Sequence, residues 1–461
     1  MQHDLVVMPQ VRPLSGSVPA PSDEGVAHLA LLVAALADGE STLTRMSSGP
    51  HVEALIAALR RLGIAIEGPS EKGELKVRGR GVRGLSDPGS PIDCGASLPT
   101  LRRLAAVLAA HRFASTLTAD SSADLSSMTD VAAALRRRYV QIEGAFSTTR
   151  TGELDPPFTV GPLAPGNALS GVEYAVDAAR TDVKEALLLS GLYADEATFV
   201  REPMVSRDHL ERLLQGLDVP VSTVGSIVSL DPADWSGNLA AFSFDVPGDT
   251  AFAALLAGLA TTIPASRVCV RGVGLNASRI GAFELVRQMG GEVEMVPHGS
   301  QFGETEGTIC TSHASLRATA MDGELWHRAS DDWPVLVALA SRARGACEVA
   351  RPPAPEPRFS RRDANERAES VIDVLAAFGV EAQIAAHGGM VIGGRPDVAF
   401  RAADIDAAGD PARATIAVML GMMGDGPTRV RRVDAWAARF PRIVGTLRAL
   451  GADVRVEPRA G

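Results

Sequence analysis

The sequence predicts an α/β protein of two domains, each built from three repeated units. Two observations lead to this prediction: a segment recurs six times with variations, and the 461-residue chain is too long for one ordinary core. Each copy contains a helical stretch rich in small residues, a turn, an alternating β-type run and a second helix. Repeats of this length indicate a multi-unit architecture and not a single doubly wound sheet.

The ends of the second helices make the repeat recognisable. Each of these helices is amphipathic and closes on a Gly that can adopt the left-handed conformation, and alternating β-type residues follow, as in "RRLGIAIE" and "RALGADVRV". The clearest copies are Leu31–Glu67, Leu255–Val296, Val335–Ile384 and Thr415–Glu457, and the looser ones are Thr100–Glu143 and Leu187–Val219.

The repeats predict the domain boundaries. Copies one to three fall in a first domain over residues 21–243, which ends in the polar, turn-rich segment "VSLDPADWSGNLAAFSFDVPGD". The second domain covers residues 244–461 together with 1–20, because an N-terminal strand over Asp4–Leu14 has no place in the first repeat. The chain then crosses twice between the domains, which predicts a hinge and a ligand cleft between them.

Composition excludes several classes of protein. A net charge of −10 argues against nonspecific nucleic-acid binding, which depends on basic surface. The sequence shows neither a secretory signal peptide nor a run of about 20 apolar residues, so we expect a cytoplasmic protein that does not span a membrane. The four cysteines form no CxxC pair and the nine histidines no HxxxH or HExxH, so neither a disulfide framework nor a metal site is predicted.

Several phrases resemble the EPSP synthase (3-phosphoshikimate 1-carboxyvinyltransferase) family, in order and over essentially the whole chain. They are "VSRDHLERLL" (205–214), "VPGDTAFAALLAGL" (246–259), "VRGVGLNASRIGAFELVRQMGGEVE" (270–294), "DDWPVLVALA" (331–340) and "ARFPRIVGTLRALGA" (438–452). The resemblance implies the enolpyruvyl transferase fold, a two-domain inside-out α/β barrel in which each domain has three βαβαββ units. It also implies a reaction that joins the enolpyruvyl group of phosphoenolpyruvate (PEP) to a hydroxyl, without a cofactor.

The chain departs from the family's signatures where they hold the acceptor phosphate. Glu24 replaces the catalytic Lys of the first helix, and Leu29 replaces its Arg. Arg180 and Asp182 stand where the family has a phosphate-binding Ser and a Gln, and Asp363 stands at a Lys. We therefore expect Arg180, Asp182, Ser206 and Asp363 to contact an acceptor other than a phosphate ester. Glu24 is predicted to be catalytic, although a first-turn acid that complements the helix dipole is an equal alternative.

The donor side is better preserved. Arg102 and Arg367 match family arginines, and Arg413 stands one place from another, so these three are predicted to bind a PEP-like anion. Asp331, two residues before the Trp–Pro pair, is predicted to be the base that activates the acceptor hydroxyl. Without the alignment to the family's motifs, these residues have simpler interpretations. Arginines on helices are most often exposed to solvent, and an Asp before a helix is commonly an N-cap.

Three functions remain open from the sequence. The leading prediction is transfer of an enolpyruvyl group from PEP to a hydroxyl of a non-shikimate acceptor in specialised metabolism. The second is a PEP-independent elimination, cyclisation or other transfer in the same cleft. The third is a pseudoenzyme that binds a ligand or partner without turnover. For the enzyme we expect small-molecule substrates, no nucleic acid or membrane partner, and a monomer.

Overall fold

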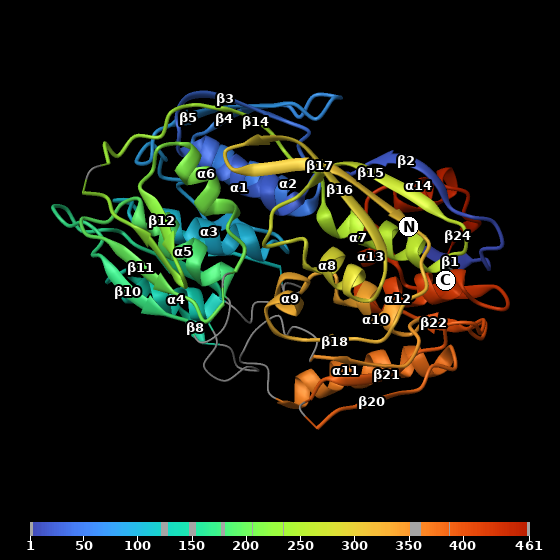
Figure 1. Cartoon of the computed structure of the whole chain (residues 1–461). Helices are drawn as coiled ribbons and strands as arrows, with labels where there is room; N and C mark the ends of the chain where they lie inside the picture. The colour runs from blue at the N-terminus through green and yellow to red at the C-terminus, as the bar shows by residue number, and fades with distance from the viewer. Residues whose placement is uncertain are drawn as a thin grey trace. The chain divides into compact units, whose positions relative to one another are not determined.

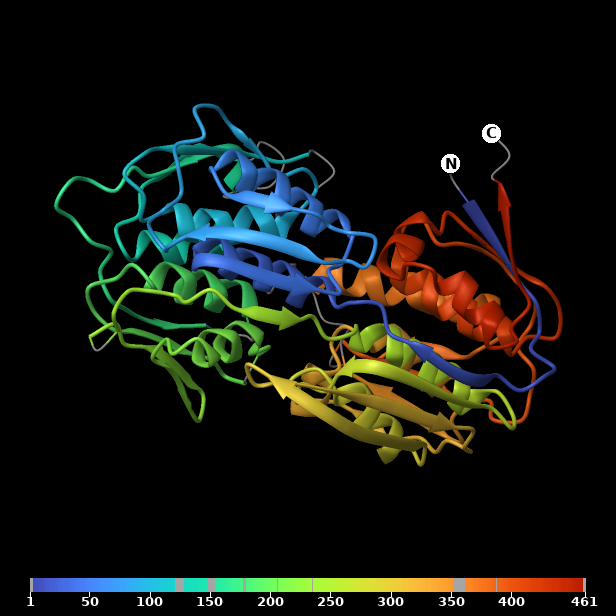
Figure 2. The same cartoon turned by 90° about the horizontal axis from the view of Figure 1, so that it is seen from above.

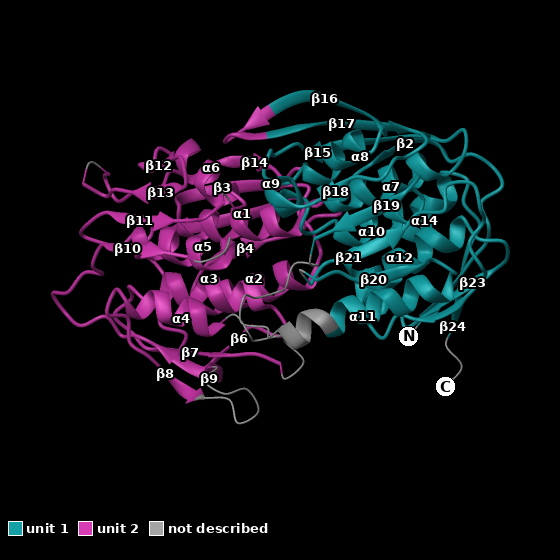
Figure 3. Ribbon diagram, turned by 60° about the horizontal axis from the view of Figure 1, so that its bottom comes forward, with its two compact units in different colours: residues 1–21, 248–299, 305–461 teal, residues 22–247, 300–304 magenta. Residues whose placement is uncertain are grey.

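The structure is a computed structural model that describes residues 3–120, 128–146, 154–176, 180–204, 206–233, 235–350, 361–386 and 388–458, with backbone only at 146 and 361–365. Contacts between Cα atoms divide the chain into two compact units (Figure 3). Unit 1 contains residues 1–21, 248–299 and 305–461, and unit 2 contains residues 22–247 and 300–304. The chain therefore passes between the units four times.

Unit 2 repeats one order of elements three times: strand, helix, strand, helix and two strands. The first repeat is β14 (Ser243–Asp245), α1 (Glu24–Leu36), β3 (Asp38–Thr44), α2 (Pro50–Arg61), β4 (Ala65–Glu67) and β5 (Leu75–Arg80). The second is β6 (Ile92–Asp93), α3 (Leu98–Leu108), β7 (Ser115–Thr118), α4 (Met128–Arg136), β8 (Ile142–Phe146) and β9 (Leu154–Val160). The third is β10 (Val172–Ala175), α5 (Thr181–Gly191), β11 (Thr198–Arg201), α6 (His209–Gly216), β12 (Val221–Val224) and β13 (Ile227–Leu230).

Unit 1 repeats the same order. Its first repeat is β2 (Ser15–Pro19), α7 (Thr250–Thr262), β15 (Arg267–Gly274), α8 (Gly281–Gln288), β16 (Glu292–Gln301) and β17 (Glu304–Ser312). The second is β18 (Ala320–Met321), α10 (Trp333–Ala340), β19 (Ala346–Val349), α11 (Arg361–Ala377), β20 (Ala382–Ile384) and β21 (Met390–Gly393). The third is β22 (Asp404–Asp406), α12 (Pro411–Met422), β23 (Thr428–Arg431), α14 (Ile443–Ala449), β24 (Val454–Pro458) and β1 (His3–Val7). Two short helices, α9 (Gly323–Arg328) and α13 (Asp434–Arg439), lie outside this pattern.

Across the described residues, each repeat forms one four-stranded sheet with the same strand order. The first two strands of the repeat are parallel, the fourth strand pairs antiparallel with the second, and the third lies at the edge. The βαβαββ unit predicted for each domain is therefore confirmed, with three units in each.

Four of the eighteen strand pairings in these six sheets are made by three strands that lie far from the rest of their repeat in the sequence. β14 pairs in parallel with β3, β2 with β15, and β1 pairs antiparallel with both β23 and β24. Figure 2 shows β1 and β24, at the blue and red ends of the chain, side by side. Only the first part of the strand expected over Asp4–Leu14 is found, because β1 ends at Val7 and Pro9 and Pro13 interrupt the segment that follows. A second strand, β2, begins at Ser15 and belongs to another sheet.

Each unit has its own hydrophobic core, filled by its inner helices. Every residue of α7 is buried, and α1 is buried from Val26 to Leu36. The outer helix α2 instead buries only positions on one face, which are Val52, Leu55, Ile56, Ala58 and Leu59. Within each unit, Figures 1 and 2 show the helices inside and the strands on the surface. The alternation of fully apolar and amphipathic helices in the sequence thus separates inner from outer helices.

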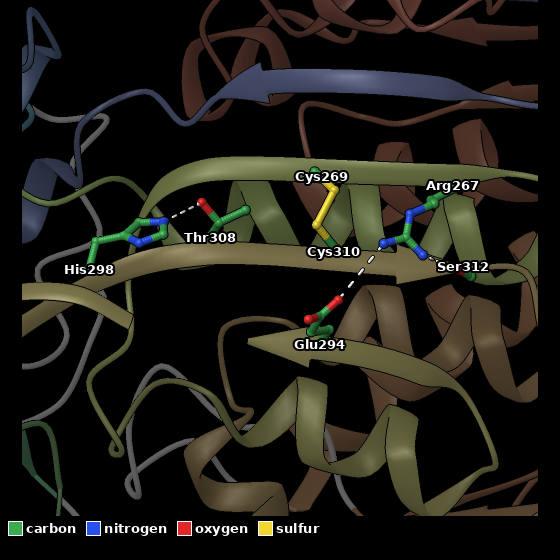
Figure 4. Close-up of a disulfide and its surroundings, with 7 residues drawn as sticks. All are labelled: Arg267, Cys269, Glu294, His298, Thr308, Cys310 and Ser312. Carbon is green, nitrogen blue, oxygen red and sulfur yellow. Dashed lines mark hydrogen bonds and ion pairs between the residues drawn. A yellow bond between two sulfur atoms is a disulfide. The ribbon is translucent and has the colours of Figure 1, made fainter. Parts of the chain in front are cut away.

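The expectation that the cysteines form no disulfide is wrong. Cys269 on β15 and Cys310 on β17 are bonded, with Cα atoms 4.0 Å apart (Figure 4). The two residues are 41 positions apart in the sequence but lie opposite each other in the antiparallel register. Spacing motifs detect only cysteines that are close in sequence, so this pair becomes visible only once the strands are aligned. None of the helices in the described part of the chain is long and apolar enough to cross a membrane.

Candidate functional site

Glu24 lies at the start of α1 and caps the N-terminus of a second helix, α2. Its Oε1 accepts a hydrogen bond from the main-chain N–H of His51 at 2.9 Å. The residue that precedes α2, Gly49, has no side chain to cap the helix, and a Cβ there would overlap the Glu24 carboxylate. The carboxylate is thus held at the positive end of the α2 dipole. This position explains how an acid is accommodated where the family has a lysine.

Replacing Glu24 with Ala should lower the free energy of unfolding by about 1 kcal/mol, because α2 loses the carboxylate that caps it. Glu24→Gln keeps an acceptor oxygen and should lose less. Urea denaturation of both variants measures the difference, and Glu71→Ala, at an exposed turn, is the control. Equal stability of the Glu24→Ala and Glu71→Ala variants would show that the cap contributes nothing.

A chain of buried polar groups continues inward from His51. His51 Nδ1 lies 3.1 Å from Ser97 Oγ, which lies 2.8 Å from Thr100 Oγ1, and this oxygen lies 2.9 Å from His28 Nε2. His28 Nδ1 is 2.7 Å from a guanidinium nitrogen of Arg103. The chain thus links the starts of α2 and α3 to the interior of α1.

The inner end of this chain is a buried ion pair. Arg103 donates to both carboxylate oxygens of Glu185 on α5, at 2.9 and 3.2 Å. Burial lowers the pKa of His28 well below its ordinary value, and the nearby charge of Arg103 lowers it further. His28 is therefore neutral at physiological pH, and the positive charge of Arg103 is balanced by Glu185.

The structure brings three of the predicted site residues together in unit 2, with one carboxylate that sequence reasoning missed. Arg180, the residue before α5, donates to both oxygens of Asp182 at 2.9 and 2.8 Å. Arg180 also pairs with Asp130 on α4 at 2.5 Å, and Arg102 on α3 approaches Asp182 to 3.7 Å. Burial opposes the ionisation of Asp182, but the hydrogen bonds from Arg180 and the charges of Arg102 and Arg180 outweigh it and lower the pKa of Asp182.

The other two residues predicted for the acceptor are Ser206 and Asp363. Ser206 is buried, its main-chain N–H donates to Glu202 at 3.3 Å, and its hydroxyl has no hydrogen-bond partner among the described residues. The Asp363 side chain lies outside the described residues, although the backbone places it in the first turn of α11.

Asp331 belongs to a second charged cluster, which lies in unit 1 where α7 and α10 begin. Its Oδ2 pairs with Arg279 at 2.5 Å. Asp249, the N-cap of α7, pairs with Arg439 at the end of α13. Asp332 is 2% exposed beside these four groups, and its Oδ1 has no hydrogen-bond partner among the described residues.

The surroundings of Asp332 favour its protonated form. Burial raises the pKa of Asp332 to about 7; Arg279 and Arg439 oppose this rise, whereas Asp331 and Asp249 add to it. With all five side chains ionised the cluster would carry three negative and two positive charges. A proton on Asp332 makes the cluster neutral and leaves Asp331 paired with Arg279.

Two of the arginines predicted to bind the donor lie in unit 1, on neighbouring helices. The Nε of Arg413, on α12, donates to the main-chain oxygen of Asp406 at 3.2 Å. Its Nη1 donates to the main-chain oxygen of Ser370 at 2.8 Å. It also donates to the Ser370 hydroxyl. These contacts tie α12 to α11, so Arg413 supports the packing of unit 1. Arg367 is half-buried on α11, and Arg102 belongs to unit 2.

Sequence reasoning missed most residues of these clusters, among them His51, Asp130, Asp249, Arg279 and Asp332. The doubled acid in "DDWP" was the one local signal for Asp332, which directly follows the predicted base. Arg279 lies in the phrase "VRGVGLNASRIGAFELVRQMGGEVE", which was matched to the family only as a whole. His51 and Asp130 carry no local motif.

Comparison with known proteins gives one consistent result. A model of the EPSP synthase (3-phosphoshikimate 1-carboxyvinyltransferase) family matches residues 8–447. A 3-phosphoshikimate 1-carboxyvinyltransferase from Methylococcus capsulatus is 32% identical over 443 residues and is covered to 96%, as is this chain. One from Acidithiobacillus ferrooxidans is 33% identical over 434 residues, which cover 94% of this chain and 95% of that protein. The solved EPSP synthase from Acinetobacter baumannii is 27% identical, with a TM-score of 0.86 over 99% of this chain and 100% of that chain.

Proposed function

The chain belongs to the EPSP synthase family, and we propose that it transfers the enolpyruvyl group of PEP to a hydroxyl of an acceptor that carries no phosphate. The acceptor then lies outside the shikimate pathway, in specialised metabolism. One observation carries this proposal: the only cation gained at the acceptor-side positions, Arg180, is already paired with the carboxylates of Asp130 and Asp182.

The charge balance around Arg180 disfavours a phosphate ester. Arg102 and Arg180 bring two positive charges, and Asp130 and Asp182 bring two negative charges, so the cluster is neutral. A phosphate dianion needs uncompensated cations, and Arg–phosphate pairs are usually bidentate. All three nitrogens of the Arg180 guanidinium already donate to the carboxylates of Asp130 and Asp182. Carboxylates near an acceptor suit hydroxyl or amino groups, which can donate to them.

The remaining proposed roles follow the family reaction. Asp331, which is paired with Arg279, takes the proton of the acceptor hydroxyl. The hydroxyl oxygen adds to C2 of PEP, and phosphate leaves when the tetrahedral intermediate collapses. Arg102 and Arg367 stay proposed for the anionic groups of PEP, whereas Arg413 is committed to main-chain oxygens.

A matched pair of ligands tests the proposal. Shikimate and shikimate 3-phosphate differ only by the phosphate, so each is added with PEP and the release of phosphate and the melting temperature are measured. We expect no release with shikimate 3-phosphate at a rate comparable to an ordinary EPSP synthase, and a larger thermal shift with unphosphorylated polyhydroxy acceptors. Restored growth of a strain that lacks its own EPSP synthase would contradict the proposal.

Removing the two carboxylates should create a phosphate site. In the double variant Asp130→Asn, Asp182→Asn, the side chains keep their shape but Arg180 loses its charge partners. We expect shikimate 3-phosphate to raise the melting temperature of this variant and not that of the wild type, with an affinity gain of roughly tenfold or more, as expected for a charge-assisted hydrogen bond of 1.5–3 kcal/mol. Asp87→Asn, on an exposed turn, is the control. An unresponsive double variant would show that Arg180 does not face the acceptor.

A further inference from the structure

We propose that His51 is the acid that protonates the methylene carbon of PEP, and that it exchanges this proton through Nε2. The inference rests on the proposed function, for which the family's catalytic lysine is missing. His51 stands beside the vacated position, because its own main-chain N–H is the group that Glu24 binds.

The hydrogen-bonded chain behind His51 has a fixed direction, set at its inner end. Arg103 can only donate hydrogen bonds, so the His28 Nδ1 that it contacts at 2.7 Å must accept. Neutral His28 then carries its single ring proton on Nε2, and this group donates to Thr100 Oγ1 at 2.9 Å. The first three groups of the chain are thereby assigned.

The two hydroxyls transmit this direction to His51. Thr100 donates its one hydrogen to the main-chain oxygen of His51 at 3.3 Å, so Ser97 must be the donor in the 2.8 Å contact with Thr100 Oγ1. With its hydrogen used there, Ser97 Oγ accepts from His51 Nδ1 at 3.1 Å. In the reverse assignment, Thr100 would donate to Ser97 and the contact with the His51 oxygen would contain no hydrogen. Only the first assignment makes every contact a hydrogen bond.

The neutral ring of His51 therefore carries its hydrogen on Nδ1, which leaves the lone pair on Nε2. His51 is half-buried, and Nε2 makes no hydrogen bond to the described residues. Fixing one ring nitrogen of a histidine in this way makes the other the atom that exchanges protons. The internal chain thus orients His51 as an acid–base group, while Ser97, Thr100 and His28 are positioning residues.

The proton balance of the proposed step is complete. The Nε2–H bond of the imidazolium breaks, and the π electrons of PEP form a C–H bond at the methylene carbon while the acceptor oxygen bonds to C2. The proton of the acceptor hydroxyl goes to a carboxylate, which passes it to the departing phosphate and is thereby regenerated. When phosphate leaves, Nε2 takes one proton back from the new methyl group, and the C2–C3 double bond forms again. The products are the enolpyruvyl ether and inorganic phosphate.

Nitrogen-15 NMR of the histidine rings in the ligand-free chain tests the assignment without any turnover. Above the pH at which His51 loses its charge, its signals should show Nδ1 protonated and Nε2 unprotonated, the reverse of the form that free histidine prefers. Thr100→Val should shift the tautomer ratio by roughly fivefold toward Nε2–H, as the loss of one hydrogen bond of about 1 kcal/mol implies. Thr100→Ser should restore the wild-type ratio. A wild-type signal with the proton on Nε2 would overturn the inference.

Kinetics test the catalytic part. His51→Gln can still donate to Ser97, so the fold and the PEP-induced thermal shift should remain, whereas turnover should fall by about 10²–10⁴-fold. His298→Gln, an exposed histidine that contacts Thr308 on the outer sheet of unit 1 (Figure 4), is the control and should not change turnover. Unchanged turnover in His51→Gln would overturn the inference alone. A wild-type chain with the Nδ1–H form but no turnover on any acceptor would overturn the proposed function instead.

Discussion

Asp332→Asn should stabilise the protein at pH 8, by about 3–4 kcal/mol. The pKa of Asp332 is raised to about 7 by burial, with Asp331 and Asp249 adding to the rise and Arg279 and Arg439 opposing it. In the unfolded chain an Asp ionises near pH 4, and each pKa unit of difference corresponds to about 1.4 kcal/mol. Asn carries no charge, so the variant does not bear the cost of a buried carboxylate.

The sign of the pH dependence follows from the proton count. Between about pH 4 and pH 7 the folded chain holds a proton on Asp332 that the unfolded chain has lost, so this group makes stability fall as pH rises. Below that window the group contributes nothing, and above it the loss is complete. Urea denaturation from pH 4 to pH 8 should therefore show a smaller fall in Asp332→Asn than in the wild type. The exposed Asp322→Asn is the control, and identical pH profiles in all three proteins would contradict the prediction.

Lys184→Met should destabilise the protein by about 3–5 kcal/mol at pH 8, the usual loss when one partner of a buried ion pair is removed. The Lys184 side chain is fully buried on α5, and its ammonium lies 3.1 Å from Glu202 and 2.6 Å from Glu211. Burial alone would lower the pKa of Lys184, but Glu211 and Glu202 outweigh it and raise the pKa. Methionine fills a similar volume but leaves two buried carboxylates without a counter-charge.

The loss in Lys184→Met should be smaller at acidic pH. Burial raises the pKa of Glu211 to about 7 even though Lys184 opposes the rise, and removal of the lysine takes this opposition away. Protonation then neutralises the carboxylate as pH falls. Thermal and urea unfolding at pH 5 and pH 8 measure the difference, with the exposed Lys76→Met as control. Adding Glu211→Gln should recover part of the stability, and failure to do so would show that the loss reflects packing and not charge.

The repeats and helices could be read from the sequence because their signals are local. A Gly that closes an amphipathic helix and an alternating run after it need only a few residues, and they place α2, α8, α11 and α14 in the right copies. The strands β1, β2 and β14 carry no such information, because their partners lie in remote segments. The Cys269–Cys310 disulfide was not predicted for the same reason.

The candidate site was predictable only where this sequence can be aligned with the signature motifs of the family. The alignment placed Arg180 and Asp182 at the acceptor side, but it could not show that Asp130 from another helix pairs with the same guanidinium. It marked Glu24 as a reversed charge, whereas its geometry is that of a cap for α2. Which atom a side chain contacts depends on packing between helices, and sequence spacing does not encode that.

The pairing of β1 with strands from a remote part of the sequence has a consequence for biosynthesis. The ribosome makes β1, which ends at Val7, long before its partner β23, which begins at Thr428, so for roughly 20–90 s at ordinary elongation rates the nascent chain carries β1 without a neighbour. The residues 22–247 of unit 2 emerge long before unit 1 is complete. Unpaired strands are templates for aggregation, and prolines such as Pro9 and Pro13 discourage pairing with other chains. The sheet that contains β1 can thus close only after β23 and β24 have been made.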